Sequence, residues 1–95
     1  MDAERQFEWD TNKAATNVQK HDVAFEEAAT VFDDLTFITV VDDEHSVDEE
    51  RYITIGASSQ GRLLMVAHVD RGGRIRIISA RKATKKEELF YASAE

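Results

Sequence analysis

The sequence predicts a small α+β domain built on one antiparallel sheet. Helix signals, namely capping residues and one apolar stripe at helical spacing, occur toward the two ends of the chain, whereas four β-rich runs follow one another in the middle with only loops between them. Consecutive strands joined by loops form an antiparallel meander, and helices must cover one of its faces. A chain of 95 residues has the length of one domain. We therefore expect a single domain over residues 1–95, in the order β-α-α-β-β-β-β-α.

The first three elements are expected near the N-terminus. Phe7 and Trp9 alternate with polar residues, which is typical of a short strand. Asp10 is a suitable N-cap for a helix over residues 11–20, because its carboxylate can accept hydrogen bonds from the free amides of the first turn. A second helix is expected over residues 24–33. Its apolar residues form one stripe at helical spacing: Phe25, Ala28, Ala29 and Phe32.

The four β-rich runs and a last helix complete the predicted fold. The runs are rich in β-branched residues: residues 36–41, 52–57, 63–69 and 74–80. The linker between the last two contains Gly72 and Gly73, which supply the positive φ that a tight hairpin turn needs. Thr84 and Glu87 match a capping box, in which each side chain accepts from the other residue's backbone amide. The last helix is expected to end at about Ser93.

Charge is sorted along the chain. The whole chain carries a net charge of −7, yet the segment 62–86 contains eight basic residues and one acidic residue, Asp70. Sorted charge can produce a local field that is opposite in sign to the charge of the molecule. We expect the acidic residues to gather on the helices and on the loop 42–50. The sheet would then offer a basic surface to an anionic ligand.

Composition disfavours several classes of protein. The chain has no cysteine, which excludes disulfides and thiolate zinc sites and agrees with a reducing compartment. The polar, acidic N-terminus does not resemble a secretory signal. The longest apolar run, residues 63–67, is far shorter than a membrane span. The expected location is the cytoplasm, without membrane contact.

The acidic loop, residues 42–50, was considered as a metal site. Asp42, Asp43, Glu44 and His45 offer oxygen and nitrogen ligands of the kind that divalent cations bind. Their spacing lacks the glycine and the alternating ligands of a calcium loop, so a solvated loop is the favoured interpretation. No metal and no cofactor is predicted.

Short motifs along the whole chain resemble the BrnT-type toxins. In chain order they are Phe7-Glu8-Trp9-Asp10, Lys13, Asn17, Lys20-His21, Phe25-Glu26-Glu27-Ala28, His45-Ser46, Glu49-Glu50-Arg51-Tyr52, Ile55-Gly56, Gly61-Arg62, Arg76-Ile77-Ile78-Ser79-Ala80-Arg81, Ala83-Thr84, Glu88 and Tyr91. Two positions depart from the pattern: Thr11 replaces a frequent proline, and Asp22 replaces a glycine. Because aspartate can adopt the left-handed conformation at modest cost, we expect the turn at Asp22 to survive.

The resemblance implies a fold and a function. BrnT-type toxins are similar in fold to the RelE ribonucleases and belong to type II toxin–antitoxin systems of bacteria and archaea. By this resemblance the chain is expected to be an endoribonuclease that stops translation and is neutralised by a BrnA-type antitoxin. The complex of toxin and antitoxin is expected to repress its own promoter, with the antitoxin supplying the DNA contacts.

Arginines are the first candidates for the active site. Metal-free RNA cleavage needs a base for the 2′-hydroxyl proton, an acid for the leaving 5′ oxygen, and cations that stabilise the charge on phosphorus. Arginine suits the last task because its planar group binds two phosphate oxygens and stays charged. The resemblance favours Arg76 and Arg81, and Arg62 is a third candidate; solvated surface charges are the alternative. If the hairpin turn has two residues, Arg62, His68 and Arg81 share one face of the sheet, and Arg74 and Arg76 share the other; a three-residue turn reverses the pairing.

The remaining candidates have equally simple structural explanations. His68 ends an apolar strand and is either a base or a packed core residue, and His21 is either catalytic or a cation at a helix end. Glu88 and Tyr91 share a helix face. Glu88 either orients an arginine or is solvated, and Tyr91 is an acid, a stacking platform or a core residue. Contacts with the RNA backbone are expected from four further cations: Lys20, Arg74, Lys82 and Lys85.

Two other functions would use the same basic surface. One is a non-catalytic nucleic-acid-binding domain, and the other is a protein-interaction module that docks an acidic partner. The runs 63–69 and 74–80 contain no aromatic residue on which bases could stack, which counts against sequence-specific reading of RNA by an RRM-type surface. Cleavage of RNA separates the enzyme from both alternatives.

Overall fold

The computed structural model describes residues 5–94, which form a five-stranded sheet. The strands are β1 (Phe7–Glu8), β2 (Ile38–Val41), β3 (Tyr52–Ala57), β4 (Leu63–Arg71) and β5 (Arg74–Lys82), and their order in the sheet is β1-β5-β4-β3-β2. Strands β2 to β5 form the predicted antiparallel meander, and β1 pairs with β5 in parallel. The predicted α+β fold and its order of elements are confirmed.

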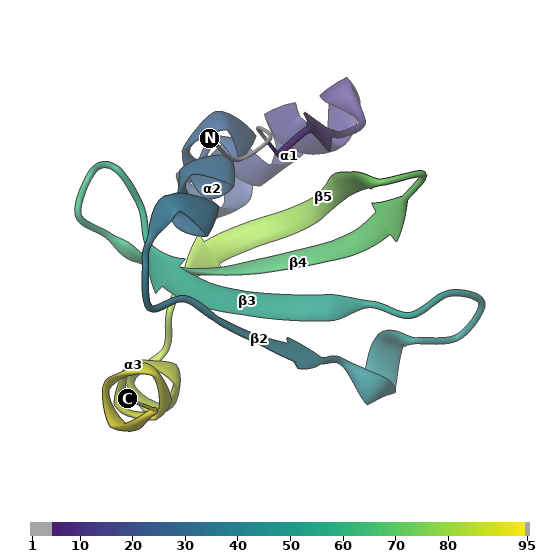
Figure 1. Cartoon of the computed structure of the whole chain (residues 1–95). Coiled ribbons are helices and arrows are strands. Elements are labelled where there is room, and N and C mark those ends of the chain that lie inside the picture. Colours follow the sequence, from purple (N-terminus) through teal and green to yellow (C-terminus); the bar gives the residue numbers. More distant parts are fainter. Residues whose placement is uncertain (1–4, 95) are drawn as a thin grey trace.

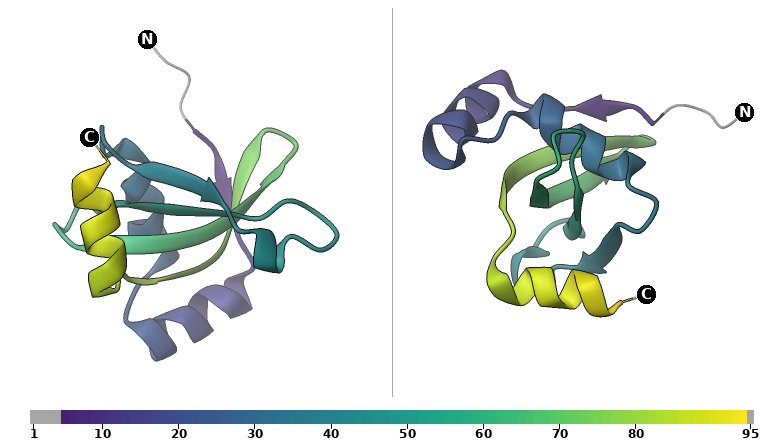
Figure 2. Two further views of the ribbon diagram at one scale, coloured as in Figure 1. Left: turned by 90° about the horizontal axis from the view of Figure 1, so that it is seen from below. Right: turned by 90° about the vertical axis from the view of Figure 1, so that its left-hand side faces the viewer.

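Helices lie on both faces of this sheet (Figure 1, Figure 2). On one side lie α1 (Thr11–His21), α2 (Phe25–Thr30) and the 3-10 helix η1 (Val31–Asp33). On the other side α3 (Lys85–Ser93) lies across one end of the sheet and leaves the rest without a helix. A second 3-10 helix, η2 (Asp43–His45), forms within the acidic loop. None of the described helices is both long enough and apolar enough to cross a membrane.

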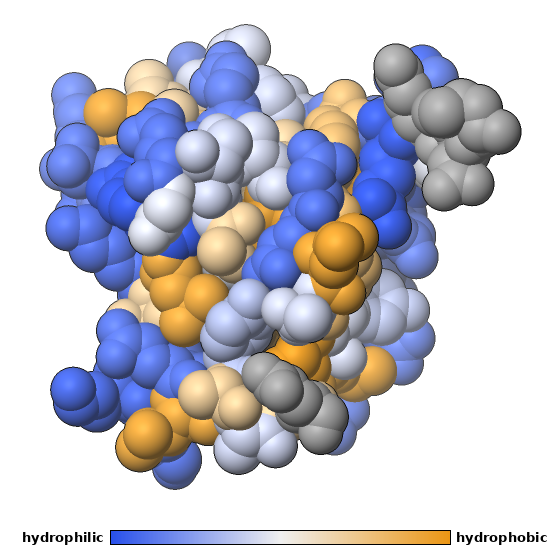
Figure 3. Space-filling view, turned by 60° about the vertical axis from the view of Figure 1, so that its left-hand side comes forward, coloured by the Kyte–Doolittle hydropathy of each residue, from blue (hydrophilic) through white to orange (hydrophobic). Residues whose placement is uncertain are grey.

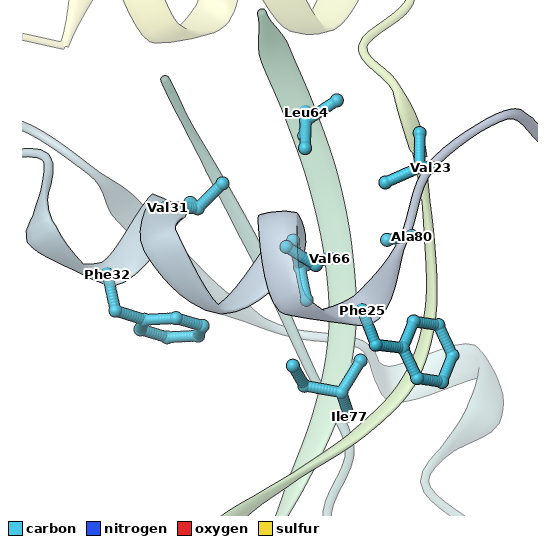
Figure 4. Packing of buried hydrophobic residues seen from close by; sticks show 9 residues of the cluster. Val23, Phe25, Val31, Phe32, Leu64, Val66, Ile77 and Ala80 are labelled. Atoms are coloured by element: carbon cyan, nitrogen blue, oxygen red, sulfur yellow. The ribbon is translucent and has the colours of Figure 1, made fainter. Parts of the chain in front are cut away.

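The core lies between α2, η1 and the sheet (Figure 4). Phe25, Ala28 and Phe32 of the predicted stripe are buried there, and Ala29 packs at the margin. They pack against inward side chains of β4 and β5, which define the covered face: Leu64, Val66, Ile77 and Ala80. Full burial of such a side chain stabilises the fold by about 1.5–3 kcal/mol. The alternate side chains of β4 lie on the opposite face: Met65, Ala67 and Val69, which are themselves buried. We call this the open face because α3 alone among the described helices crosses it.

Polar residues fix the helix ends as the sequence predicts. The Asp10 carboxylate accepts hydrogen bonds of 2.8 and 3.1 Å from two amides of the first turn of α1. Asp22 ends this helix with a φ of 58°, so the turn survives without glycine. Thr84 and Glu87 form the complete capping box of α3. These caps set where α1 and α3 begin, and both helices border the basic strand β5.

Candidate nucleic-acid interface

A β-bulge in β5 decides which face its basic side chains occupy. The turn at Gly72 and Gly73 has two residues, both with positive φ, as predicted. Further along, the register between β4 and β5 shifts by one residue beside Ala67, and Ile78 is left as an extra residue of β5. One extra residue reverses the alternation of every side chain beyond it. Arg81 pairs with a residue of the open face and thus lies on that face.

The bulge contradicts one expectation from the sequence and brings three arginines of β5 to the same face of the sheet. The expected common face of Arg62, His68 and Arg81 is wrong, because the alternation was counted without an extra residue. Instead Arg74, Arg76 and Arg81 all lie on the open face, two before the bulge and one after it. The strand β5 therefore presents three guanidinium groups to the same side of the sheet.

Arg74 and Arg76 share one carboxylate partner. The strand β1 places Glu8 beside Arg76, whose Nη1 donates a 3.0 Å hydrogen bond to Glu8 Oε2. Arg74 Nη1 lies 3.8 Å from the other oxygen, Oε1. All three side chains remain partly exposed. A solvated ion pair of this kind contributes little to stability, so a phosphate group can take the place of the carboxylate.

Arg81 is paired with the first turn of α3. Its two terminal nitrogens each donate a 2.9 Å hydrogen bond to Glu87, and this arginine holds the pKa of Glu87 below its usual value. Lys82 and Lys85 are exposed on either side of the connection to α3. Arg81 and Lys85 therefore extend the basic surface that Arg74 and Arg76 begin, whereas Lys82 pairs with Leu64 and lies on the other side of the strand.

Tyr91 and Glu88 take different surroundings on α3. The Tyr91 hydroxyl donates a 2.6 Å hydrogen bond to Asp34 Oδ2 and lies 2.9 Å from Thr36 Oγ1. Burial would raise the pKa of Asp34, but hydrogen bonds from Ala57, Tyr91 and Thr36 lower it to about 2. The Glu88 side chain is exposed. No described residue of α3 is fully buried, so polar contacts, with Arg81 and with Asp34, hold this helix on the sheet. Figure 3, which brings the α3 side forward, shows apolar atoms in separate patches among polar ones.

A groove of about 340 Å³ lies between α1 and β5. β1 pairs with the edge of β5 at Ile75 and Arg76. Further along this edge, the Asn17 side chain accepts a 3.1 Å hydrogen bond from the amide of Ala80 and donates a 2.8 Å hydrogen bond to its carbonyl oxygen, as a neighbouring strand would. The walls combine cations and small polar groups: Asn12, Lys13, Thr16, Asn17, Lys20, His21, Ile78 and Ser79. The groove has the size of a small-ligand site. It brings Lys20 and His21 together beside β5.

Arg62 lies away from this basic surface, against the helices of the covered face. Its guanidinium binds both oxygens of Glu27 and donates a 3.0 Å hydrogen bond to the carbonyl oxygen of Asp22. Only 4 % of the Glu27 side chain is exposed, and Ser58 donates a further 2.6 Å bond to it. The hydrogen bond from Arg62 lowers the pKa of Glu27. Arg62 thus neutralises a buried carboxylate and ties α2 to the turn before β4.

His68 is a packed residue of the covered face. Its ring stacks on Tyr52 with centroids 5.7 Å apart and meets Phe32 edge-on at 5.1 Å. Nε2 lies 2.7 Å from Thr54 Oγ1, whereas the buried Nδ1 has no hydrogen-bond partner among the described residues. Burial lowers the pKa of His68 to about 4. A neutral, enclosed ring has no access to a substrate on the open face.

A comparison with known protein families identifies the family of this chain. The family model described as "Ribonuclease toxin, BrnT, of type II toxin-antitoxin system" matches residues 9–87. The chain belongs to the BrnT family. The BrnT match covers α1, the whole meander and the arginines of β5. Membership makes the chain a ribonuclease toxin of the type II class, whose members act together with an antitoxin.

A solved BrnT structure shares the fold. The 1.1 Å crystal structure of the Brucella abortus ribonuclease toxin, BrnT, superposes with a TM-score of 0.65 at 21 % sequence identity, over 86 % of this chain and 100 % of the Brucella chain. At this identity the likeness establishes the fold alone. No protein with a curated description matches the chain.

Two carboxylates that contact the arginines of β5 were not among the residues that the sequence predicted for the site: Glu8 and Glu87. Glu8 had a visible signal: it lies between Phe7 and Trp9, which both point into the core, so its side chain must point to the other face. Its partner Arg76 is 68 positions away, and no local pattern could pair them. Glu87 was assigned to the capping box, which it does form, but its contact with Arg81 was not foreseen.

One group of described side chains is close enough together to hold a cation. Ligand atoms of Asp42, Glu44 and His45 lie within 4.8 Å of one another. His45 Nδ1 is 2.8 Å from Asp42 Oδ2, so the histidine already has an acidic partner. The group lies in the acidic loop around η2, and Glu44 and His45 are exposed. We assign it no role.

Proposed function

We propose that the chain is a metal-independent endoribonuclease toxin that inhibits translation and is neutralised by a BrnA-type antitoxin. The observation that carries the proposal is the bulge at Ile78, which brings Arg74, Arg76 and Arg81 to the open face. Each of these arginines is partly exposed and pairs with a partly exposed carboxylate. Arginines arranged in this way can exchange a carboxylate for a phosphate at small cost.

The spacing of the arginines suits an extended RNA strand. At about 3.3 Å per residue, Arg76 and Arg81 are roughly 15 Å apart along β5. They would therefore bind different phosphates of one strand, with Arg74 supporting Arg76. Lys85 would continue this contact beyond Arg81, and Lys82 would contact the RNA only where the strand passes the end of β5.

The groove between α1 and β5 supports the same proposal from the side of the strand. Lys20 and His21 would flank an RNA strand that follows the exposed edge of β5. Both side chains would contact the RNA backbone at this end of the site. Tyr91 and Glu88 would act on the position of α3, and through it on Arg81.

The chemistry proposed needs no metal. The 2′-hydroxyl of RNA is the nucleophile, and the arginines supply the positive charge that stabilises the pentavalent phosphorus. The antitoxin would block the open face, and promoter DNA would be contacted by the antitoxin and not by this chain.

The test is RNA cleavage by the purified chain in the presence of EDTA. We expect cleavage that yields 2′,3′-cyclic phosphate ends, and a 10²–10³-fold loss in Arg76→Ala, the size typical of removing one pre-aimed donor. Arg5→Ala is the matched control, because Arg5 contacts the carbonyl oxygen of Phe32 in η1. Binding of RNA without cleavage would favour a non-catalytic nucleic-acid-binding domain instead. Induced expression with and without the antitoxin, read as translation arrest, tests the role in the cell.

A further inference from the structure

The open face has arginines for a phosphate but no histidine beside Arg74 and Arg76 among the described residues. His68 is enclosed on the covered face, and His45 pairs with Asp42 in the acidic loop. Arg76 lies near the start of α1, within electrostatic range of its N-cap Asp10. His21 lies at the other end of this helix, whose eleven residues span about 16 Å, so it is far from Arg76. A base for cleavage at Arg76 must therefore come from another residue type.

Three carboxylates contact arginines of this hairpin, and their oxygens differ in availability. Both oxygens of Glu87 bind Arg81, and one also accepts from the amide of Thr84. Both oxygens of Glu49 bind Arg71. In Glu8, Oε2 binds Arg76, whereas Oε1 accepts no hydrogen bond from any described residue. Glu8 alone of the three has an oxygen without a hydrogen bond in the described part of the chain, and that oxygen lies 3.8 Å from Arg74 Nη1.

The surroundings hold Glu8 firmly in this position. Its neighbours point to the covered face: Phe7 packs against Phe32 with ring centroids 5.5 Å apart, and Trp9 packs against Phe25 at 5.8 Å. β1 pairs in parallel with β5 and sets Glu8 opposite Arg76. Anchors on both sides of a functional residue give it the fixed geometry that catalysis needs.

From this geometry we propose that Glu8 is the general base of the proposed RNA cleavage, an inference that rests on the proposed function. When the scissile phosphate replaces Glu8 on Arg74 and Arg76, β1 keeps the carboxylate beside them. The 2′-hydroxyl of the preceding ribose then transfers its proton to Glu8 Oε1. The 2′ oxygen forms a bond to phosphorus while the bond from phosphorus to the 5′ oxygen breaks. The leaving 5′ oxygen takes a proton from water, and Glu8 returns its proton to the solvent. The products are a 2′,3′-cyclic phosphate and a 5′-hydroxyl.

The experiment compares Glu8→Gln with the control Glu49→Gln. The control also removes one negative charge from a glutamate that pairs with an arginine of the same hairpin. We expect Glu8→Gln to lower kcat by 10²–10⁴-fold, the usual contribution of a general base, with KM changed less than threefold. The acidic limb of the pH–rate profile should disappear with it. Glu49→Gln should keep kcat within threefold and keep the limb. Glu8→Asp keeps a carboxylate but moves it away from the substrate, because the side chain is shorter. Its kcat should fall at least tenfold, and the acidic limb of its pH–rate profile should remain.

Several results would overturn the assignment. A Glu8→Gln enzyme that cleaves within fivefold of wild type overturns it, and the proposed function still stands if Arg76→Ala is inactive. A slow Glu8→Gln enzyme that keeps the acidic limb shows that Glu8 only positions Arg76. If Glu8→Gln fails to fold, Glu8→Asp decides the question. Full activity of Glu8→Asp would show that Glu8 is not the general base. A wild-type chain that does not cleave RNA removes both proposals together.

Discussion

Two arginine–glutamate pairs of the same chemistry occupy the two faces of the sheet. Arg62 and Arg76 are equally exposed, with 26 % of each side chain accessible, but their partners are not. Glu27 is 4 % exposed beside Arg62, whereas Glu8 is 27 % exposed beside Arg76. Removing Arg62 leaves a carboxylate buried without its cation, and removing Arg76 leaves one that water can solvate. Burial of the partner therefore distinguishes a structural arginine from one that can exchange its partner for a ligand.

The largest loss of stability is expected from Arg62→Ala. The buried Glu27 would lose its ion pair, and the free energy of unfolding should fall by about 3 kcal/mol. Arg76→Ala should change the same quantity by less than about 1 kcal/mol, because its pair is solvated. Urea denaturation of both variants measures the difference. Equal losses would mean that the two pairs play the same structural part.

His68 should make the stability of the covered face depend on pH. Its pKa is about 4 in the folded chain and about 6.5 when unfolded, so the unfolded chain takes up the proton first as the pH falls. The free energy of unfolding should therefore drop by roughly 3 kcal/mol between pH 6.5 and pH 4. In His68→Leu this part of the drop should be absent. An unchanged pH profile in the variant would show that His68 is accessible to solvent and protons in the fold.

Gly56 tests how tightly η1 packs on the covered face. A β-carbon at this position would come within 2.8 Å of Val31 Cγ1 and 3.0 Å of Phe37 Cβ. Gly56→Ala should lower the free energy of unfolding by about 1–3 kcal/mol, the usual range for overpacking. Thermal unfolding followed by circular dichroism measures it. Wild-type stability would mean that η1 can shift without loss.

A small effect is expected from Tyr91→Phe on α3. The variant removes the hydrogen bond to Asp34, whose carboxylate keeps its bonds from Ala57 and Thr36, so the loss should be about 1 kcal/mol. Asp34 stabilises the fold above pH 3.8, and this contribution is lost as the pH falls toward about 2. The variant should show a smaller loss in that range. Acid titration of stability measures it, and an effect above 3 kcal/mol would mean that α3 is held much more firmly than its exposure indicates.

The sequence predicted local structure well, because local structure depends on neighbouring residues. Asp10, Asp22 and the pair Thr84 and Glu87 end or begin helices as their types require. The bulge was missed, although the chain carried a sign of it. Residues 74–77 alternate arginine and isoleucine, and the alternation breaks at Ile78, where the extra residue lies.

The partners of the arginines were beyond any local pattern. Glu27 and Arg62 are 35 positions apart, and only the packing of α2 against the turn before β4 brings them together. His68 shares its strand parity with Leu64 and Val66, so its burial was one of the two outcomes that the pattern allowed. Which of several arginines holds a buried carboxylate follows from the tertiary fold alone.

Whether RNA is cleaved on the open face is decided by the rates of RNA cleavage by Arg76→Ala and Arg62→Ala, measured side by side at a temperature where both are folded. We expect a loss of at least 100-fold for Arg76→Ala and a rate within threefold of wild type for Arg62→Ala. A folded Arg62→Ala protein that has lost cleavage, beside an Arg76→Ala protein that retains it, would instead place the chemistry on the covered face.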